Sequence, residues 1–259
     1  MSLPKIDQPM FQIEIPSLKK KYPYRPFLVK EEKILLMAKD SGEESDILSS
    51  IKQVVNNCCL DPTLNINTLS IFDLEYIFIK LRMNSVDNQI DVTYIDDEDE
   101  KDYNFKIDLN DVKINFPENN DNNIKITNTS GIIMKYPEAG LYDDKEFLNI
   151  QDEYFFNLIL KCIDKIYMNE SVYESKDYTT QQLSEFLENL DLKTFQKIKD
   201  FLEKTPKLNY EINYKNSLGN DKKIVLSSLN DFFMLGWVII ILKIITIQYF
   251  LWFSITDIE

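Results

Sequence analysis

The sequence predicts an α+β fold, with N-terminal helices beside an antiparallel sheet and C-terminal helices beside a β-hairpin. Apolar residues recur at helical spacing in separate segments, such as 46–58 and 183–202. Between these segments, apolar and polar residues alternate over 89–116, as in antiparallel strands with one wet face. A second alternating pair flanks Gly219-Asn220, which is typical of a hairpin turn. These three observations define the fold class.

Length and charge limit the function. The 259 residues fit one large or two modest domains, and a 44% hydrophobic content is enough for a sizeable core. The chain carries 43 acidic and 29 basic residues, a net charge of −14. Nucleic-acid binding needs a basic face that displaces counterions, so we expect no nucleic-acid partner. The acidic balance indicates a soluble surface.

Cysteine and histidine usage argues against catalysis. Cys58 and Cys59 are adjacent, Cys162 stands apart, and histidine is absent. This spacing shows no disulfide framework and favours a reducing compartment. Without histidine the chain lacks the commonest general base and metal ligand. We therefore predict no enzyme, no catalytic residue, no cofactor and no metal, and the N-terminus has no apolar secretory signal.

We expect a first domain over residues 1–136. Met10–Ile15 alternates as a strand that Pro16 ends. A helix follows the prolines of 22–26, a second covers 46–58, and a third starts at Ser70, where Asp73 has capping-box spacing. Cys58 closes the apolar stripe of the second helix and is interpreted as a small core residue.

The alternating residues of this domain predict one antiparallel meander. Its strands cover 90–94, 105–109 and 112–116, and Ile124, Ile126, Ile132 and Met134 extend it. The acidic run Asp96–Glu100 lies between the first two strands. It lacks the glycine and the spaced glutamate of a calcium loop, so we expect a solvated hairpin tip.

A second domain is expected over 137–231. Apolar residues of Tyr154–Tyr167 form a helical stripe. Thr179 or Thr180 can cap the next helix, and Asp191 a further one that ends at Thr205-Pro206. A hairpin turning at Asn216–Asp221 closes the domain.

Several segments resemble the T-even-type bacteriophage baseplate hub protein family, which includes a hub subunit and a hub-assembly factor. They run in order along most of the chain, namely Arg25–Met37, Ile71–Tyr76, 177–208 and Leu229–Phe233. The resemblance implies a late, non-enzymatic structural or assembly protein whose partners are other baseplate and tail proteins. It implies a place in the host cytoplasm during assembly and, if the protein is retained, in the tail baseplate of the virion.

The chain departs from this family at two hairpin tips. Several relatives resemble zinc-ribbon halves there, with Cys-Xaa-Xaa-Cys pairs that can hold zinc. Here the tips read Asp96–Glu100 and Asn216–Gly219, and neither contains cysteine. We therefore assign no metal.

Residues 232–259 form an apolar tail with two interpretations. Phe232–Phe253 is long enough for a transmembrane helix, which makes a membrane-anchored cytoplasmic binding protein the alternative function. Lys243 near its middle would cost about 3 kcal/mol on insertion. The other interpretation is a frame slip near Trp237, because a one-base shift of AT-rich codons permits a polar tail like that of the family. Resequencing the end of the gene tests this.

A carboxylate enzyme is the third possibility. Asp73 and Glu75 are two residues apart and point in different directions on a helix, while Asp143, Asp144 and the run 96–100 read as exposed. These acids form no coherent pair of the kind that glycosidases use. We expect them to carry no reaction.

Overall fold

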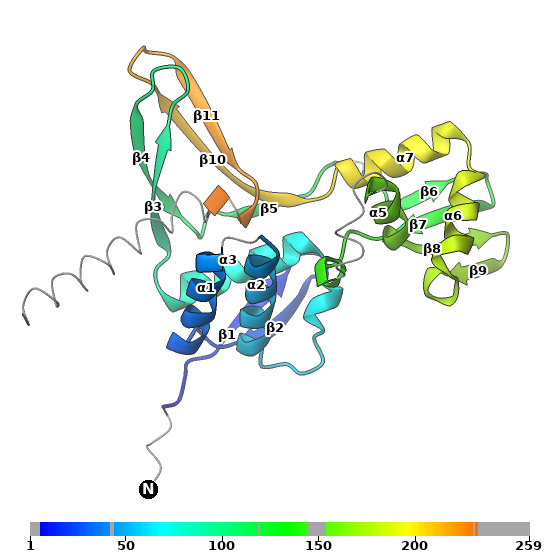
Figure 1. The fold of residues 1–259 in the computed structure, drawn as a ribbon, viewed down its shortest axis with the longest axis horizontal. Coiled ribbons are helices and arrows are strands. Elements are labelled where there is room, and N and C mark those ends of the chain that lie inside the picture. The colour runs from blue at the N-terminus through cyan, green and yellow to red at the C-terminus, as the bar shows by residue number, and fades with distance from the viewer. Residues whose placement is uncertain (1–5, 42–43, 119, 144–153, 230, 233–259) are drawn as a thin grey trace, which may run out of the picture. The chain divides into compact units, whose positions relative to one another are not determined.

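The computed structural model describes residues 6–41, 44–118, 120–143, 154–229 and 231–232 (Figure 1). The chain divides into two compact units, each built from two stretches of sequence. The first unit contains residues 1–74 and 115–206, and the second contains 75–114 and 207–259. This interleaving differs from the consecutive domains expected with a boundary at 136. Sequence patterns place local elements, whereas the contacts that define a unit join distant segments.

The N-terminal elements of the first unit follow the prediction. A two-stranded antiparallel sheet packs with helices, and Ile13 and Ile15 of its first strand are buried, as are Tyr22 and Tyr24 of its second. The predicted strand and helices are confirmed. The elements are β1 (Phe11–Ile15), β2 (Lys20–Tyr24), α1 (Val29–Ser41), α2 (Glu44–Cys58), the 3-10 helix η1 (Ile66–Thr68) and the start of α3 (Ile71–Ser85).

Two buried carboxylates anchor the ends of these helices. Glu31 at the start of α1 pairs with Arg25 at 2.9 Å and accepts the Leu28 N–H at 2.9 Å. Asp73 accepts the N–H of Ser17 at 3.0 Å and also the hydroxyls of Ser17 and Ser70. Both acids lie near a helix N-terminus and accept hydrogen bonds, which offset part of the cost of burying them; burial still raises the pKa of Asp73.

The rest of the first unit is a four-stranded antiparallel sheet, in the order β6-β7-β8-β9, with helices packed on it (Figure 1). Helix α7 contacts β6, and α5 contacts α6, α7 and β8. A buried cluster that includes Ile132, Ile159 and Phe201 forms this core. The elements are β6 (Asn123–Lys125), β7 (Ser130–Met134), the 3-10 helix η2 (Ala139–Asp143), α5 (Tyr154–Cys162), β8 (Ile163–Met168), β9 (Ser171–Glu174), the 3-10 helix η3 (Ser175–Asp177), α6 (Thr180–Glu188) and α7 (Leu192–Glu203).

The predicted helix over Tyr154–Tyr167 is wrong beyond Cys162. From Ile163 the chain is strand β8, which pairs with β7 on one side and β9 on the other. Ile163 and Tyr167, four residues apart, fit the helical period and the period of two alike, and bulky side chains suit a strand. Pairing with β7 decided the outcome, and no pattern in the sequence predicted β9.

The second unit contains the residues of α3 from Glu75 and five strands: β3 (Gln89–Ile95), β4 (Asp102–Asp108), β5 (Lys113–Asn115), β10 (Lys207–Lys215) and β11 (Asp221–Leu226). Both hairpins are confirmed. The single meander is wrong, because β3 and β4 form their own sheet, β5 pairs with β10, and β6 and β7 belong to the other unit. Alternation identifies the buried face of a strand, but it does not identify its neighbour.

Candidate functional site

Two hairpin tips of the second unit meet in the densest polar network of the described residues. The first tip, between β3 and β4, closes through Asp96 N–H to Lys101 O at 3.0 Å. The second, between β10 and β11, closes through Asn216 N–H to Asn220 O at 3.0 Å. Gly219 in the second tip has φ +88°, a conformation that glycine adopts without strain.

Aromatic rings on β3, β4 and β10 pack against one another next to the tips. The ring of Tyr214 on β10 lies 4.9 Å from that of Tyr103 and 5.3 Å from that of Phe105, both on β4. It also lies 6.2 Å from the ring of Tyr94 on β3. Edge and tilted contacts at these distances add to the burial energy of aromatic pairs. The two hairpins therefore share one small aromatic core.

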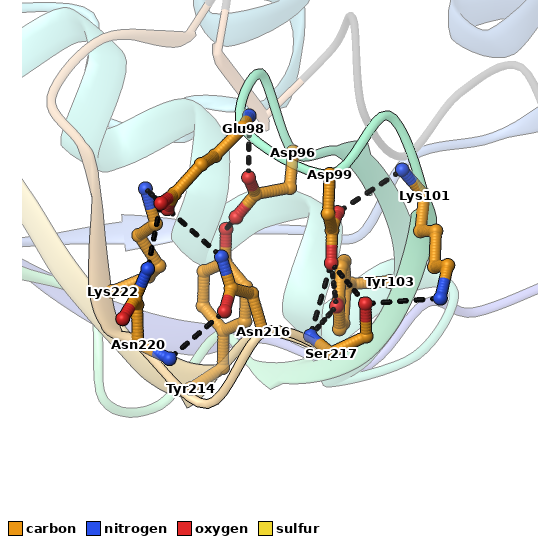
Figure 2. Close-up of polar contacts among 10 residues, drawn as sticks. All are labelled: Asp96, Glu98, Asp99, Lys101, Tyr103, Tyr214, Asn216, Ser217, Asn220 and Lys222. Carbon is orange, nitrogen blue, oxygen red and sulfur yellow. Dashed lines mark hydrogen bonds and ion pairs between the residues drawn. The ribbon is translucent and has the colours of Figure 1, made fainter.

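Three carboxylates of the first tip bind the second tip (Figure 2). Asp96 accepts the Tyr214 hydroxyl. Glu98 accepts amide hydrogens from Asn216 at 3.0 Å and Asn220 at 2.6 Å, and pairs with Lys222 at 2.6 Å. We call this network the tip clasp. Its residues are Asp96, Glu98, Asp99, Lys101, Tyr103, Tyr214, Asn216, Ser217, Asn220 and Lys222.

Asp99 forms the other half of the tip clasp. One of its oxygens accepts the N–H of Ser217 at 3.0 Å, the hydroxyl of Ser217 at 2.8 Å and the hydroxyl of Tyr103 at 2.6 Å. Lys101 donates to the same Ser217 hydroxyl at 2.9 Å. The second tip is therefore held by hydrogen bonds at Asn216, Ser217 and Asn220.

These contacts change the acidity of the groups involved. The Tyr214 hydroxyl lowers the pKa of Asp96, the Lys222 ammonium lowers that of Glu98, and the Tyr103 hydroxyl lowers that of Asp99. Burial, followed by the hydrogen bond to Asp96, raises the pKa of Tyr214. All three acids are thus held as carboxylates, which are the better hydrogen-bond acceptors.

The hairpin tip at 96–100 is confirmed, but the prediction that its acids are solvated is wrong for Asp96 and Asp99. Asp96 is only 1% exposed and Asp99 is half-buried, while Asp97 and Glu100 remain exposed. The acids do not simply repel one another into water, because the second tip supplies amide, hydroxyl and ammonium donors. No pattern in the sequence near Asp96 predicts a hydrogen-bond partner more than a hundred residues away.

The other acids that the sequence singled out occupy separate places. Asp73 lies in the first unit among serine donors, whereas Glu75 lies in the second, where it accepts the Leu229 N–H at 3.1 Å. Asp143 pairs with Lys52, and Asp144 lies outside the described residues. Within the described part of the chain, no three Asp, Glu, Cys or His residues are grouped so that they could hold a metal ion.

Cys58 is a core residue, as predicted. It is fully buried at the end of α2, and burial raises the pKa of its thiol to about 12. A thiol that stays protonated is a poor nucleophile.

No helix in the described ranges is long and apolar enough to cross a membrane. The structure does not describe residues 233–259. The candidate span Phe232–Phe253 therefore lies outside the described residues except for Phe232, and so does Trp237, where the frame slip is expected.

The described residues define a protein of mixed α+β class, with two hairpins tied together by the polar contacts of the tip clasp. A comparison with protein families identifies the family. The family model of the T4 bacteriophage base plate protein matches residues 8–234, and the chain belongs to this family. Searches of curated proteins and of solved structures found no match.

Proposed function

We propose that this baseplate protein is a component of the baseplate hub, or a factor that assembles the hub, and that it acts through protein–protein contacts. Family membership supports a role at the baseplate, and the hub is the part whose proteins the segments 25–37 and 71–76 resemble. Its partners are other baseplate and tail proteins. It works in the host cytoplasm during assembly and, if retained, in the tail of the virion.

The tip clasp is the observation that carries this proposal. Its charged and polar groups hold two hairpins together, and aromatic side chains of the hairpins pack between them. The same unit exposes large apolar side chains, with Ile95 60%, Leu218 61% and Val225 46% exposed. Apolar anchors on a rigid support are typical of surfaces that bind other proteins.

Mass spectrometry of purified phage particles tests the proposal. Peptides of this chain at a stoichiometry comparable to other baseplate proteins indicate a hub component. Their absence from particles, together with tails that fail to assemble when the gene is deleted, indicates an assembly factor. Normal tails and full infectivity after deletion contradict both roles.

Two variants connect that experiment to the tip clasp. Replacing the exposed Leu218 with aspartate changes the apex of the second tip and leaves every clasp contact in place. We expect the variant to fold normally and to support fewer infectious particles than the wild type. Asp97→Asn, an exposed change on the first tip, is the control that should retain full yield.

A further inference from the structure

Among the described residues, no strand pairs with the outer edge of β9 in the four-stranded sheet, and the structure indicates what can pair there. The opposite edge, β6, contacts α7, and the Lys197 ammonium donates to the backbone carbonyl of Lys125 at 3.3 Å. At the β9 edge the side chains are exposed, with Val172 60% and Tyr173 38% exposed. One edge of this sheet is therefore contacted by a helix, whereas the side chains at the other edge are exposed.

The hairpin geometry shows which backbone groups point outward. Met168 and Ser171 are paired across the two-residue turn Asn169-Glu170, so their N–H and C=O groups face each other. The next pair, Tyr167 and Val172, is then of the non-hydrogen-bonded kind. In agreement, Asn169 N–H points to the β7 side and donates to Thr129 O at 2.8 Å. Val172 and Glu174 consequently direct their N–H and C=O groups away from β8.

This edge lacks lysine, proline and a bulge, three of the features that protect edge strands, and its strand is four residues long. Natural edge strands are guarded by lysine, proline or a bulge. The edge strand β11 has Lys222 and Lys223, whereas β9 reads Ser171-Val172-Tyr173-Glu174 and pairs with β8 in unbroken register. The edge strand β1 also lacks lysine and proline, but it buries its apolar residues Ile13 and Ile15.

Side chains on both faces of β9 can bind an added strand. Val172 shares a face with Tyr167, which lies over Gly131, and Tyr173 is on the opposite face, where its ring lies 6.3 Å from that of Tyr178. An added strand would gain backbone hydrogen bonds from the edge and side-chain contacts on alternate faces.

We propose that an extended segment of a different baseplate protein, carrying basic residues, adds to β9 as a fifth strand. Each copy of this chain has a net charge of −14, so two copies repel and a basic segment is favoured. Glu170, exposed in the turn before β9, supplies local negative charge for it, whereas the Glu174 carboxylate is paired with the Lys165 ammonium at 2.9 Å. This inference rests on the proposed function, because it names the kind of partner contact through which that function works.

Complementation of a phage that lacks the gene tests the inference. Val172→Pro removes the outward N–H and spares the ladder to β8, since proline is tolerated where an edge N–H faces solvent. Val172→Lys places a charge on the edge without restricting the backbone. Met168→Lys introduces the same charge at an exposed apolar residue of β8 and is the matched control. We expect both Val172 variants to lower the yield of infectious particles by roughly tenfold or more, the loss that corresponds to a tenfold weaker complex, and the control to retain full yield.

The outcomes separate this inference from the function on which it rests. Full yield with both Val172 variants, or equal losses with Val172→Lys and Met168→Lys, overturns strand addition and leaves the hub role standing. Full yield without the gene overturns both. Thermal melts show whether a variant is folded, and if Val172→Pro unfolds, Val172→Lys decides. A wild-type dimer in solution that Val172→Pro dissociates would identify a second copy as the occupant and overturn the choice of partner.

Hydrogen exchange gives an independent measurement. In the isolated protein the amides of Val172 and Glu174 should exchange quickly and that of Tyr173 slowly. In complexes assembled with other baseplate proteins, the first two should become protected. Unchanged exchange at Val172 and Glu174 in such complexes contradicts pairing at this edge.

Discussion

Glu75 is a buried acid in the second unit whose charge opposes folding. Burial, with a smaller contribution from Asp231, raises the pKa of its carboxyl to about 7, although the hydrogen bond from the Leu229 N–H and the charge of Lys207 lower it. A raised carboxyl pKa means that the folded protein favours the neutral acid. The contribution of Glu75 to the free energy of unfolding is therefore fully present below its unfolded pKa of about 4.3. It is lost as the pH rises through the folded pKa of about 7.

Glu75→Gln should remove this pH dependence. Glutamine keeps an oxygen that can accept the Leu229 N–H and carries no charge. At pH 8 we expect the free energy of unfolding to increase by up to about 4 kcal/mol, because the carboxyl pKa is about 4.3 unfolded and about 7 folded and each pKa unit corresponds to about 1.4 kcal/mol. Denaturant titrations at pH 5 and pH 8 measure it. A difference between variant and wild type that is the same at both pH values would contradict this explanation.

Gly131 on β7 has no room for a side chain. A Cβ atom there would lie 2.4 Å from the Tyr167 hydroxyl oxygen and 2.7 Å from the backbone oxygen of Ile124. Gly131→Ala should therefore destabilise the first unit by about 1–3 kcal/mol, the usual cost of overpacking. Gly140→Ala, whose Cβ would meet Asn67 O at 3.0 Å, is a milder control in the same unit. Equal losses in the two variants would show that the close approach at Gly131 is not limiting.

At the scale of elements, the tip clasp should make the two hairpins sensitive to acid. Asp96, Glu98 and Asp99 have lowered pKa values, so their contribution to stability is present above pH of about 4 and is lost as the pH falls through their folded values. Tyr214→Phe removes the hydroxyl that bonds Asp96. We expect the variant to have a lower melting temperature than the wild type at pH 7. The difference between its melting temperatures at pH 7 and at pH 3 should be smaller than in the wild type.

Near-UV circular dichroism measures the unfolding of the tip clasp directly, because four aromatic rings lie in it or beside it. Tyr210→Phe on the same strand is the control, since it also removes one tyrosine hydroxyl outside the clasp. A Tyr214→Phe protein whose melting temperature depends on pH as that of the wild type does would show that the clasp contributes little to stability.

Elements that depend on nearby residues were predictable. Thr179 caps α6 in a reciprocal capping box with Gln182, and Asp191 caps α7 through the N–H of Thr194. These signals lie within one helical turn, so sequence spacing contains them. The end of α5 at Cys162 is different, because the strand after it forms only when β7 and β9 are present.

At the scale of the whole molecule, the two units share the chain in an interleaved way. The link between β4 and β5 stays in the second unit, whose strand β5 pairs with β10 almost a hundred residues later. In the first unit, β7 pairs with β8, which lies beyond residue 136. Any cut at residue 136 therefore separates paired strands in both units.

Fragments 1–136 and 137–231 should consequently fail to fold alone. Each would expose unpaired strand edges, which favour aggregation. Far-UV circular dichroism and size-exclusion chromatography of the separate fragments, compared with fragments mixed during refolding, measure this. Two monomeric fragments with sharp melting transitions would instead support the consecutive domains expected from the sequence.

The sequence by itself determined the mixed fold class, most helices with their caps, both hairpins and the resemblance that family membership confirmed. These features depend on periodicity and short spacings, which the chain carries locally. Only the tertiary structure decided that β5 joins β10, that residues 163–168 are a strand and that acids at 96–99 meet a turn at 216–220. The physical reason is that backbone pairing and carboxylate burial depend on donors supplied from far along the chain, and an alternating pattern does not name them.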